Sequence, residues 1–206
     1  MPLETFLYLL PFLLGSLILH ELAHAYVATW LGDPTPREQG RLTLNPIVHL
    51  DPLGSAMFVL TAFIGSFIFG WAKPVLVNAR WFRRPQVDMA LVAAAGPATN
   101  LVVALVCVAL LVHGDLDGTA FDVALRAYEV NIVLGIFNLI PIPPLDGSRI
   151  VAAVFPSALY ARWAQLDQVG MIALFGLIFV FNDRFWEFFS TVLDETTRVM
   201  VSIVGG

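Results

Sequence analysis

Long apolar segments without charge follow one another along the chain, and they restrict its fold more than any other feature. They cover residues 5–19, 53–72, 89–112, 130–145 and 169–181. A helix of about 20 apolar residues spans a bilayer. The third segment has that length, and the first reaches it because its helix is predicted to continue to about Trp30. We expect the two later segments to form further spans, although prolines interrupt the fourth near its end.

The composition agrees with a chain surrounded by lipid. Hydrophobic residues make up 58% of the sequence and charged residues 13%, whereas about a quarter of the residues in a soluble domain are charged. This predicts an all-α membrane protein, a polytopic bundle of about four to six transmembrane helices. We see no linker and expect a single domain over 1–206, with a core at 5–150 and C-terminal helices at 158–204. The stretch 185–204 mixes aromatic and charged side chains, which is typical of a helix lying in the membrane interface.

Positive charge predicts how the helices are oriented. The loop between the second and third segments contains positive residues and no acid before Asp88: Lys73, Arg80, Arg83 and Arg84. The loop after the third segment is mainly acidic. Because positive loops stay in the cytoplasm, the third segment should start on the cytoplasmic side and the fourth should return to it. The net charge of −5 leaves no basic stripe for nucleic acid.

The second segment, at 53–72, decides the rest of the topology. If it dips into the membrane and returns, the region around 40–80 is a re-entrant or membrane-embedded segment. Gly65, Gly70 and Pro74 would let the chain turn back and offer an edge strand to a peptide; alternatively, Gly65 and Ser66 serve simple helix packing. We prefer re-entry because it brings the candidate ligands described next to a similar depth, although about 20 uncharged residues suffice to cross a bilayer.

The sequence His20-Glu21-Leu22-Ala23-His24 matches the pattern H-E-x-x-H on a predicted helix. Residues four apart lie on one face of a helix, so both imidazoles can bind one zinc ion. Glu21 is then placed to act as general base on a zinc-activated water. Ionisable side chains are costly within an apolar run, which argues against a chance match.

A catalytic zinc site has three protein ligands and one open position. Asp146 follows the proline-rich break at the end of the fourth segment. Its carboxylate is either the third ligand or a helix cap for an element that starts at Gly147, and the histidine pair favours the ligand. A metalloprotease of a different class would use a glutamate instead, and Glu129, about a helix length away, is the candidate.

Several stretches together resemble the site-2 protease family of intramembrane metalloproteases. They are the H-E-x-x-H pattern in an apolar helix, NLIPIPPLDG at 138–147 and AGPATN at 95–100. GRLTLNP at 40–46 and AKPVLVN at 72–78 further resemble a compact bacterial and archaeal branch of that family, and we see no PDZ-like or CBS-like domain. The resemblance covers most of the chain.

The resemblance implies a zinc metalloendopeptidase with His20, His24 and Asp146 as ligands and Glu21 as catalytic base. It further implies that Asn138 positions substrate or stabilises the oxyanion. The partners would be the lipid bilayer and a transmembrane protein or peptide, cleaved in regulated intramembrane proteolysis. We expect an integral protein of a prokaryotic cell membrane, with the site toward the cytoplasm and no nucleic acid as partner. The sequence leaves the oligomeric state open.

Other polar residues and other functions leave alternatives open. Asn100 either faces the site, as a second substrate-positioning candidate, or bonds a neighbouring helix. His49 is a gate, an extra ligand or an interfacial histidine. A metal-ion transporter would need several weak sites in series, and the sequence offers one cluster. A catalytically inactive relative that only binds membrane helices would not need Glu21.

Overall fold

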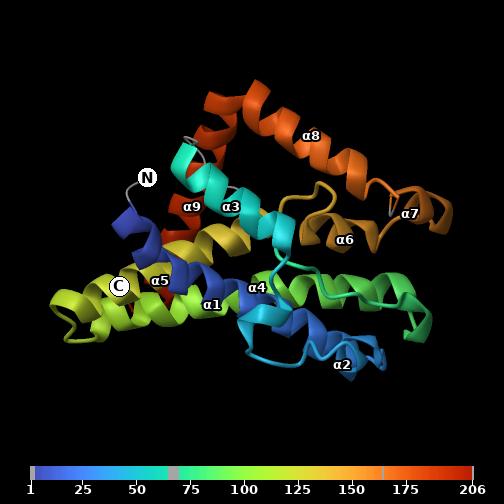
Figure 1. Cartoon of the computed structure of the whole chain (residues 1–206), viewed down its shortest axis with the longest axis horizontal. Helices are drawn as coiled ribbons and strands as arrows, with labels where there is room; N and C mark the ends of the chain where they lie inside the picture. Colours follow the sequence, from blue (N-terminus) through green and yellow to red (C-terminus); the bar gives the residue numbers. More distant parts are fainter. Residues whose placement is uncertain (1–2, 65–69, 164, 206) are drawn as a thin grey trace.

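The structure, a computed structural model, describes residues 3–64, 70–163 and 165–205, and the regular elements in these ranges are helices (Figure 1). In chain order they are α1 (Leu3–Trp30), α2 (Thr35–Glu38), the 3-10 turn η1 (Pro46–Val48), α3 (Pro52–Ile64), the 3-10 turn η2 (Ala79–Trp81), α4 (Pro85–His113), α5 (Gly118–Asn138), α6 (Asp146–Ala152), α7 (Ser157–Trp163), α8 (Asp167–Val180) and α9 (Asn182–Ile203). The expected all-α polytopic fold is confirmed.

Two of the described helices, α1 and α4, are long and apolar enough to cross a membrane. A third span exists if α8 and α9, which meet at a bend of 92°, are counted together. The fourth apolar segment behaves differently from the expectation, because its helix begins twelve residues earlier, at Gly118, and includes most of the acidic loop. Alanine, leucine, arginine and glutamate in 120–129 are strong helix formers, which explains the extension.

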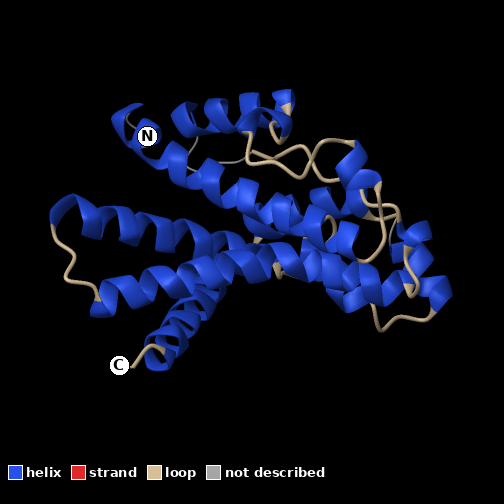
Figure 2. Cartoon of the chain, turned by 90° about the horizontal axis from the view of Figure 1, so that it is seen from below, coloured by secondary structure: helices blue, strands red, loops and turns tan. Residues whose placement is uncertain are grey.

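Helix α4 lies at the centre of the bundle, where it packs against α1, α5 and α6. Figure 1 and Figure 2 both show α4 and α5 as an antiparallel pair joined by a short loop. Small residues at these contacts, such as Ala28 and Ala104, are fully buried. Small side chains let helix backbones approach closely, which stabilises helix pairs in lipid, where hydrophobic driving force between helices is absent.

The expected amphipathic helix near the C-terminus is α9, and protein covers part of its apolar side, whereas Phe188, Val199 and Ile203 are exposed. Met200 packs with Ala104 and Ile132 of α4 and α5. Phe185 and Phe189 pack against α8. Its place in the membrane interface stays a prediction.

The segment at 53–72 returns to the side from which it starts. Helix α3 covers 13 residues in the described part of this segment, about 20 Å of helix. Leu50 and Ala72 then form an antiparallel bridge, and the Lys73 amide donates to the His49 carbonyl over 2.8 Å. The two ends of the segment therefore lie side by side, as re-entry requires. Gly65, where we expected the chain to turn, lies outside the described residues.

This return depends on a glycine in α3. A Cβ at Gly54 would lie 2.1 Å from the carbonyl oxygen of Trp71. We expect Gly54→Ala to lower the free energy of unfolding by about 1–3 kcal/mol, because the returning chain must move away. Thermal unfolding in detergent measures the effect. The matched control is Gly15→Ala in α1, where nothing lies within 4 Å of the added Cβ; equal destabilisation by both would contradict the close approach.

Candidate metal centre

Two histidines from α1 and one aspartate from α6 converge on one point inside the bundle. His20 and His24 are both buried and lie one helical turn apart. The Nε2 atoms of the two imidazoles lie 3.1 and 3.3 Å from the same oxygen, Oδ2 of Asp146. The three side chains form a group that could hold one metal ion, with ligand atoms within 4.8 Å of one another.

Asp146 reaches the histidines because the chain breaks after α5. Helix α5 ends at Asn138, and α6 begins at Asp146 itself, with Leu145 as its N-cap. The break folds tightly, since a Cβ at Gly147 would lie 2.1 Å from the carbonyl oxygen of Leu139. The Asp146 side chain makes no capping bond and points at the imidazoles instead.

The chemistry of the three side chains fits a zinc ion. Oδ2 of Asp146 is buried and makes no hydrogen bond, although it lies close to two nitrogens. An orphaned carboxylate oxygen facing two imidazole nitrogens is costly without a cation. Two histidines and one carboxylate are a ligand set that zinc takes in hydrolytic enzymes.

The far side of each imidazole is fixed by α4. Nδ1 of His20 lies 2.6 Å from Oδ1 of Asn100, and Nδ1 of His24 lies 2.7 Å from the Val92 carbonyl oxygen. Both partners can only accept, so each Nδ1 carries the proton and donates. In a neutral imidazole the Nε2 lone pair is then free for a metal, which is the usual arrangement around metal-bound histidine.

Asn100 is held in place by a polar network between the helices. Its Nδ2 donates to the Ser16 carbonyl over 3.2 Å and to Oδ1 of Asn131 over 2.8 Å. Nδ2 of Asn131 donates in turn to Oγ of Ser16 over 2.8 Å. Sequence reasoning missed Ser16 and Asn131, although a polar residue inside an apolar segment is the signal that singled out Asn100.

Asn100 therefore contacts a histidine and not a surface open to substrate. It is 0% exposed, and both of its polar atoms are used within the protein. The sequence left open whether Asn100 faces the site or bonds a neighbouring helix. In the structure it does both, since it faces the site and bonds α1 and α5. Its predicted substrate-positioning role is not what this geometry supports.

Gly96 of α4 forms the wall beside both imidazoles. A Cβ there would lie 2.5 Å from Nε2 of His24 and 2.6 Å from Nε2 of His20. Any side chain at this position would occupy the space in which the two ligand atoms meet. The glycine is therefore required for close packing of α4 against the histidines.

The carboxylate of Glu21 is held by the returning chain. Its Oε2 accepts a hydrogen bond of 3.2 Å from the amide of Val75.

The two other polar residues singled out in the sequence contact only the protein itself. Asn138 donates to the Leu134 carbonyl within its own helix, so a role toward substrate stays a prediction. His49 is buried, with Nε2 2.9 Å from the Thr43 carbonyl oxygen and no partner for Nδ1.

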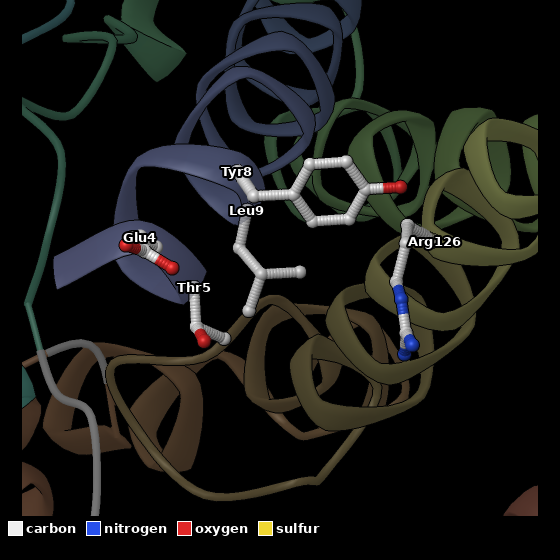
Figure 3. Close-up of a pocket in the computed structure, with 5 residues that line it drawn as sticks. All are labelled: Glu4, Thr5, Tyr8, Leu9 and Arg126. Carbon is white, nitrogen blue, oxygen red and sulfur yellow. The ribbon is translucent and has the colours of Figure 1, made fainter. Parts of the chain in front are cut away.

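Glu129, the alternative third ligand, lies elsewhere. Its Oε2 pairs with Arg126 over 2.5 Å. Arg126 lines a cavity of about 440 Å³ with the first two turns of α1, and Figure 3 shows these side chains. The α1 residues that line this cavity lie more than two helical turns before His20, so the cavity is separate from the metal group. It is lined by Glu4, Thr5, Tyr8, Leu9 and Arg126.

Replacement of Asn100 tests the network behind His20. We expect Asn100→Ala to lower the affinity for Zn²⁺ about 10–100-fold, because the imidazole loses the acceptor that fixes its tautomer and ring orientation. Competition against a chelator measures this affinity. Asn138→Ala, which removes an asparagine bonded only to its own helix, should retain it. Unchanged affinity in Asn100→Ala would contradict the orienting role.

Comparisons with known proteins agree with this site. The model of peptidase family M50 matches residues 116–181. The "Putative zinc metalloprotease YwhC" of Bacillus subtilis is 42% identical over 188 residues, which cover 87% of this chain and 83% of that protein. "Putative zinc metalloprotease Rip2" of Mycolicibacterium smegmatis is 34% identical over 138 residues, covering 65% of this chain and 52% of that protein.

A more distant relative is the "Zinc metalloprotease MJ0392" of Methanocaldococcus jannaschii, which is 26% identical over 139 residues. The match covers 68% of this chain and 32% of that protein. No solved structure matches the chain. The apolar helices and the relatives identify an integral membrane metalloprotease that uses zinc. The chain belongs to peptidase family M50, the site-2 protease family.

Proposed function

We propose that this protein is a zinc-dependent endopeptidase that hydrolyses peptide bonds inside or at the edge of transmembrane segments of other proteins. The observation that carries the proposal is the position of the metal group. His20 and His24 lie on α1, a helix long and apolar enough to span the membrane. A substrate must therefore bring its peptide bond to a membrane-spanning helix.

In this proposal His20, His24 and Asp146 hold the zinc ion. Bound there, zinc supplies a Lewis acid that polarises a peptide carbonyl and lowers the pKa of water to about 7. The histidine side chains are nearly inaccessible, whereas that of Asp146 is 19% exposed. This difference favours approach of water and substrate from the side of Asp146.

Glu21 supplies the proton transfer. As the water oxygen bonds to the peptide carbon, Glu21 accepts a proton from that water, and it returns the proton to the amine nitrogen when the C–N bond breaks. The Val75 amide occupies Oε2 of the carboxylate. Oε1 is then the oxygen that remains for the proton.

The chemistry of the site favours a particular substrate and side of the membrane. The peptide bonds of an intact helix are shielded by its own hydrogen bonds, so the substrate should be a transmembrane helix that unwinds locally. The basic loop at 73–84 lies at the same end of the molecule as the metal group, because Val75 contacts Glu21 and Phe82 packs on Ala28 of α1. Positive loops stay in the cytoplasm, which favours a cytoplasmic site in a cell membrane.

The alternative functions are supported less well. Transport of a metal ion needs several sites in series, and His20, His24 and Asp146 are the one group of this kind in the described part of the chain. An inactive helix-binding relative has no use for a carboxylate beside the metal ligands. Glu21 occupies that position.

Glu21→Gln tests the catalytic step. We expect it to keep bound zinc and to lose cleavage of a transmembrane peptide by about 100-fold or more, because the amide cannot accept the proton. Mass spectrometry of membrane peptides from cells with either form would measure activity and identify substrates together. Cleavage at the wild-type rate by Glu21→Gln would sink the proposal.

The identity of the third ligand is tested by zinc content. We expect Asp146→Ala to lower the bound zinc per protein about tenfold or more, and Glu129→Ala to leave it at the wild-type level, because Glu129 pairs with Arg126 away from the site. Metal analysis of the purified proteins gives the comparison. The reverse pattern would assign the protein to another class of metalloprotease.

A further inference from the structure

Buried charged side chains from the loop after α1 tie down the extended chain at residues 71–78, called the 71–78 segment below. Oδ2 of Asp33, which is fully buried, accepts a bond of 2.7 Å from the Asn78 amide at the end of this segment. Arg41 is 3% exposed and reaches the beginning of the segment. The segment is thus fixed at both ends by one loop.

Arg41 donates only to backbone carbonyls. Its Nη1 lies 2.6 Å from the Val48 oxygen and 3.2 Å from the Lys73 oxygen, and its Nη2 lies 3.3 Å from the Pro74 oxygen. Among the described residues no carboxylate forms an ion pair with it. Burying a cation without a counter-charge is costly. The presence of a buried arginine at position 41 therefore needs a reason beyond packing.

The reason lies in the peptide group between Pro74 and Val75. This group is planar and trans, so fixing its carbonyl also fixes the direction of its N–H. Arg41 binds the carbonyl, and the N–H of the same group donates to Oε2 of Glu21. The guanidinium presents several donors in a rigid, planar arrangement, which suits it to hold two consecutive carbonyls in one geometry.

We propose that Arg41 is a positioning residue for the catalytic base: it orients the Pro74–Val75 peptide group, and that group orients the carboxylate of Glu21. The inference rests on the proposed function and extends it to a residue that touches neither metal nor substrate. It predicts that loss of Arg41 slows the chemical step while binding of zinc and substrate continues.

The experiment is a double-mutant cycle between Arg41→Ala and Val75→Pro, in which proline removes the N–H. Each variant should lower kcat about 10–100-fold, the scale expected when a catalytic group is misplaced by about 1 Å. KM should stay within about twofold and the zinc content should be unchanged. The two losses should not multiply in the double variant, because both act through one hydrogen bond. The substrate is a synthetic transmembrane peptide in detergent micelles.

Controls separate this role from general stability. Arg83→Ala removes an exposed arginine after the 71–78 segment and should leave kcat unchanged. Arg41→Lys keeps the charge without the planar donors and should restore only part of kcat; it replaces Arg41→Ala in the cycle if the latter does not fold. Multiplying losses, or a change confined to KM, would overturn the proposal.

A second readout does not need activity. Hydrogen–deuterium exchange of peptides covering the 71–78 segment should quicken in Arg41→Ala, while exchange in α4 stays the same. Unchanged exchange would overturn the positioning role even in an active enzyme. If the wild type cleaves no transmembrane peptide, the proposed function fails, and the exchange experiment still tests the contact of Arg41 with this segment.

Discussion

The contact between α1 and α4 is the interaction on which the metal site depends. Helix α1 supplies both imidazoles, but α4 supplies the Asn100 side chain and the Val92 carbonyl that fix their tautomer. Gly96 lets α4 approach closely enough for these bonds to form. Buried polar groups are costly unless they are paired, so the same bonds that prepare the ligands stabilise the helix pair. Binding chemistry and packing cannot be separated at this contact.

The sequence predicted the helical fold and the pairing of His20 with His24 on one helix face because those depend on local patterns. Apolar length determines α1 and α4, and the four-residue spacing places both histidines on one face of a helix. The position of Asp146 was harder to predict, because its approach to the two histidines depends on a break in the helix after Asn138. Prolines mark such a break but do not specify its direction; in the structure the chain folds back until Gly147 lies against the Leu139 carbonyl.

The partners around the site could not be predicted, because they are set by contacts distant in sequence. Asn131 and Ser16 lie on different helices and meet Asn100 only after packing. The Val75 contact with Glu21 involves a backbone amide, whose chemistry is the same in every residue except proline and leaves no trace in the sequence. The boundary of α5 also differed from the hydropathy pattern, since charged helix formers extend the helix beyond its apolar part.

A carboxylate on a membrane helix, such as Glu21 on α1, finds a free backbone donor only outside the helix, because helical N–H groups are already bonded within the helix. Non-helical backbone at membrane depth is the remaining source, and it is stable there only when protein satisfies its polar groups. The return after α3 brings such backbone to Glu21. Arg41 and Asp33 then satisfy the carbonyls and the amide that water would bond at a surface. The returning segment thus gives Glu21 a backbone donor that α1 itself cannot supply.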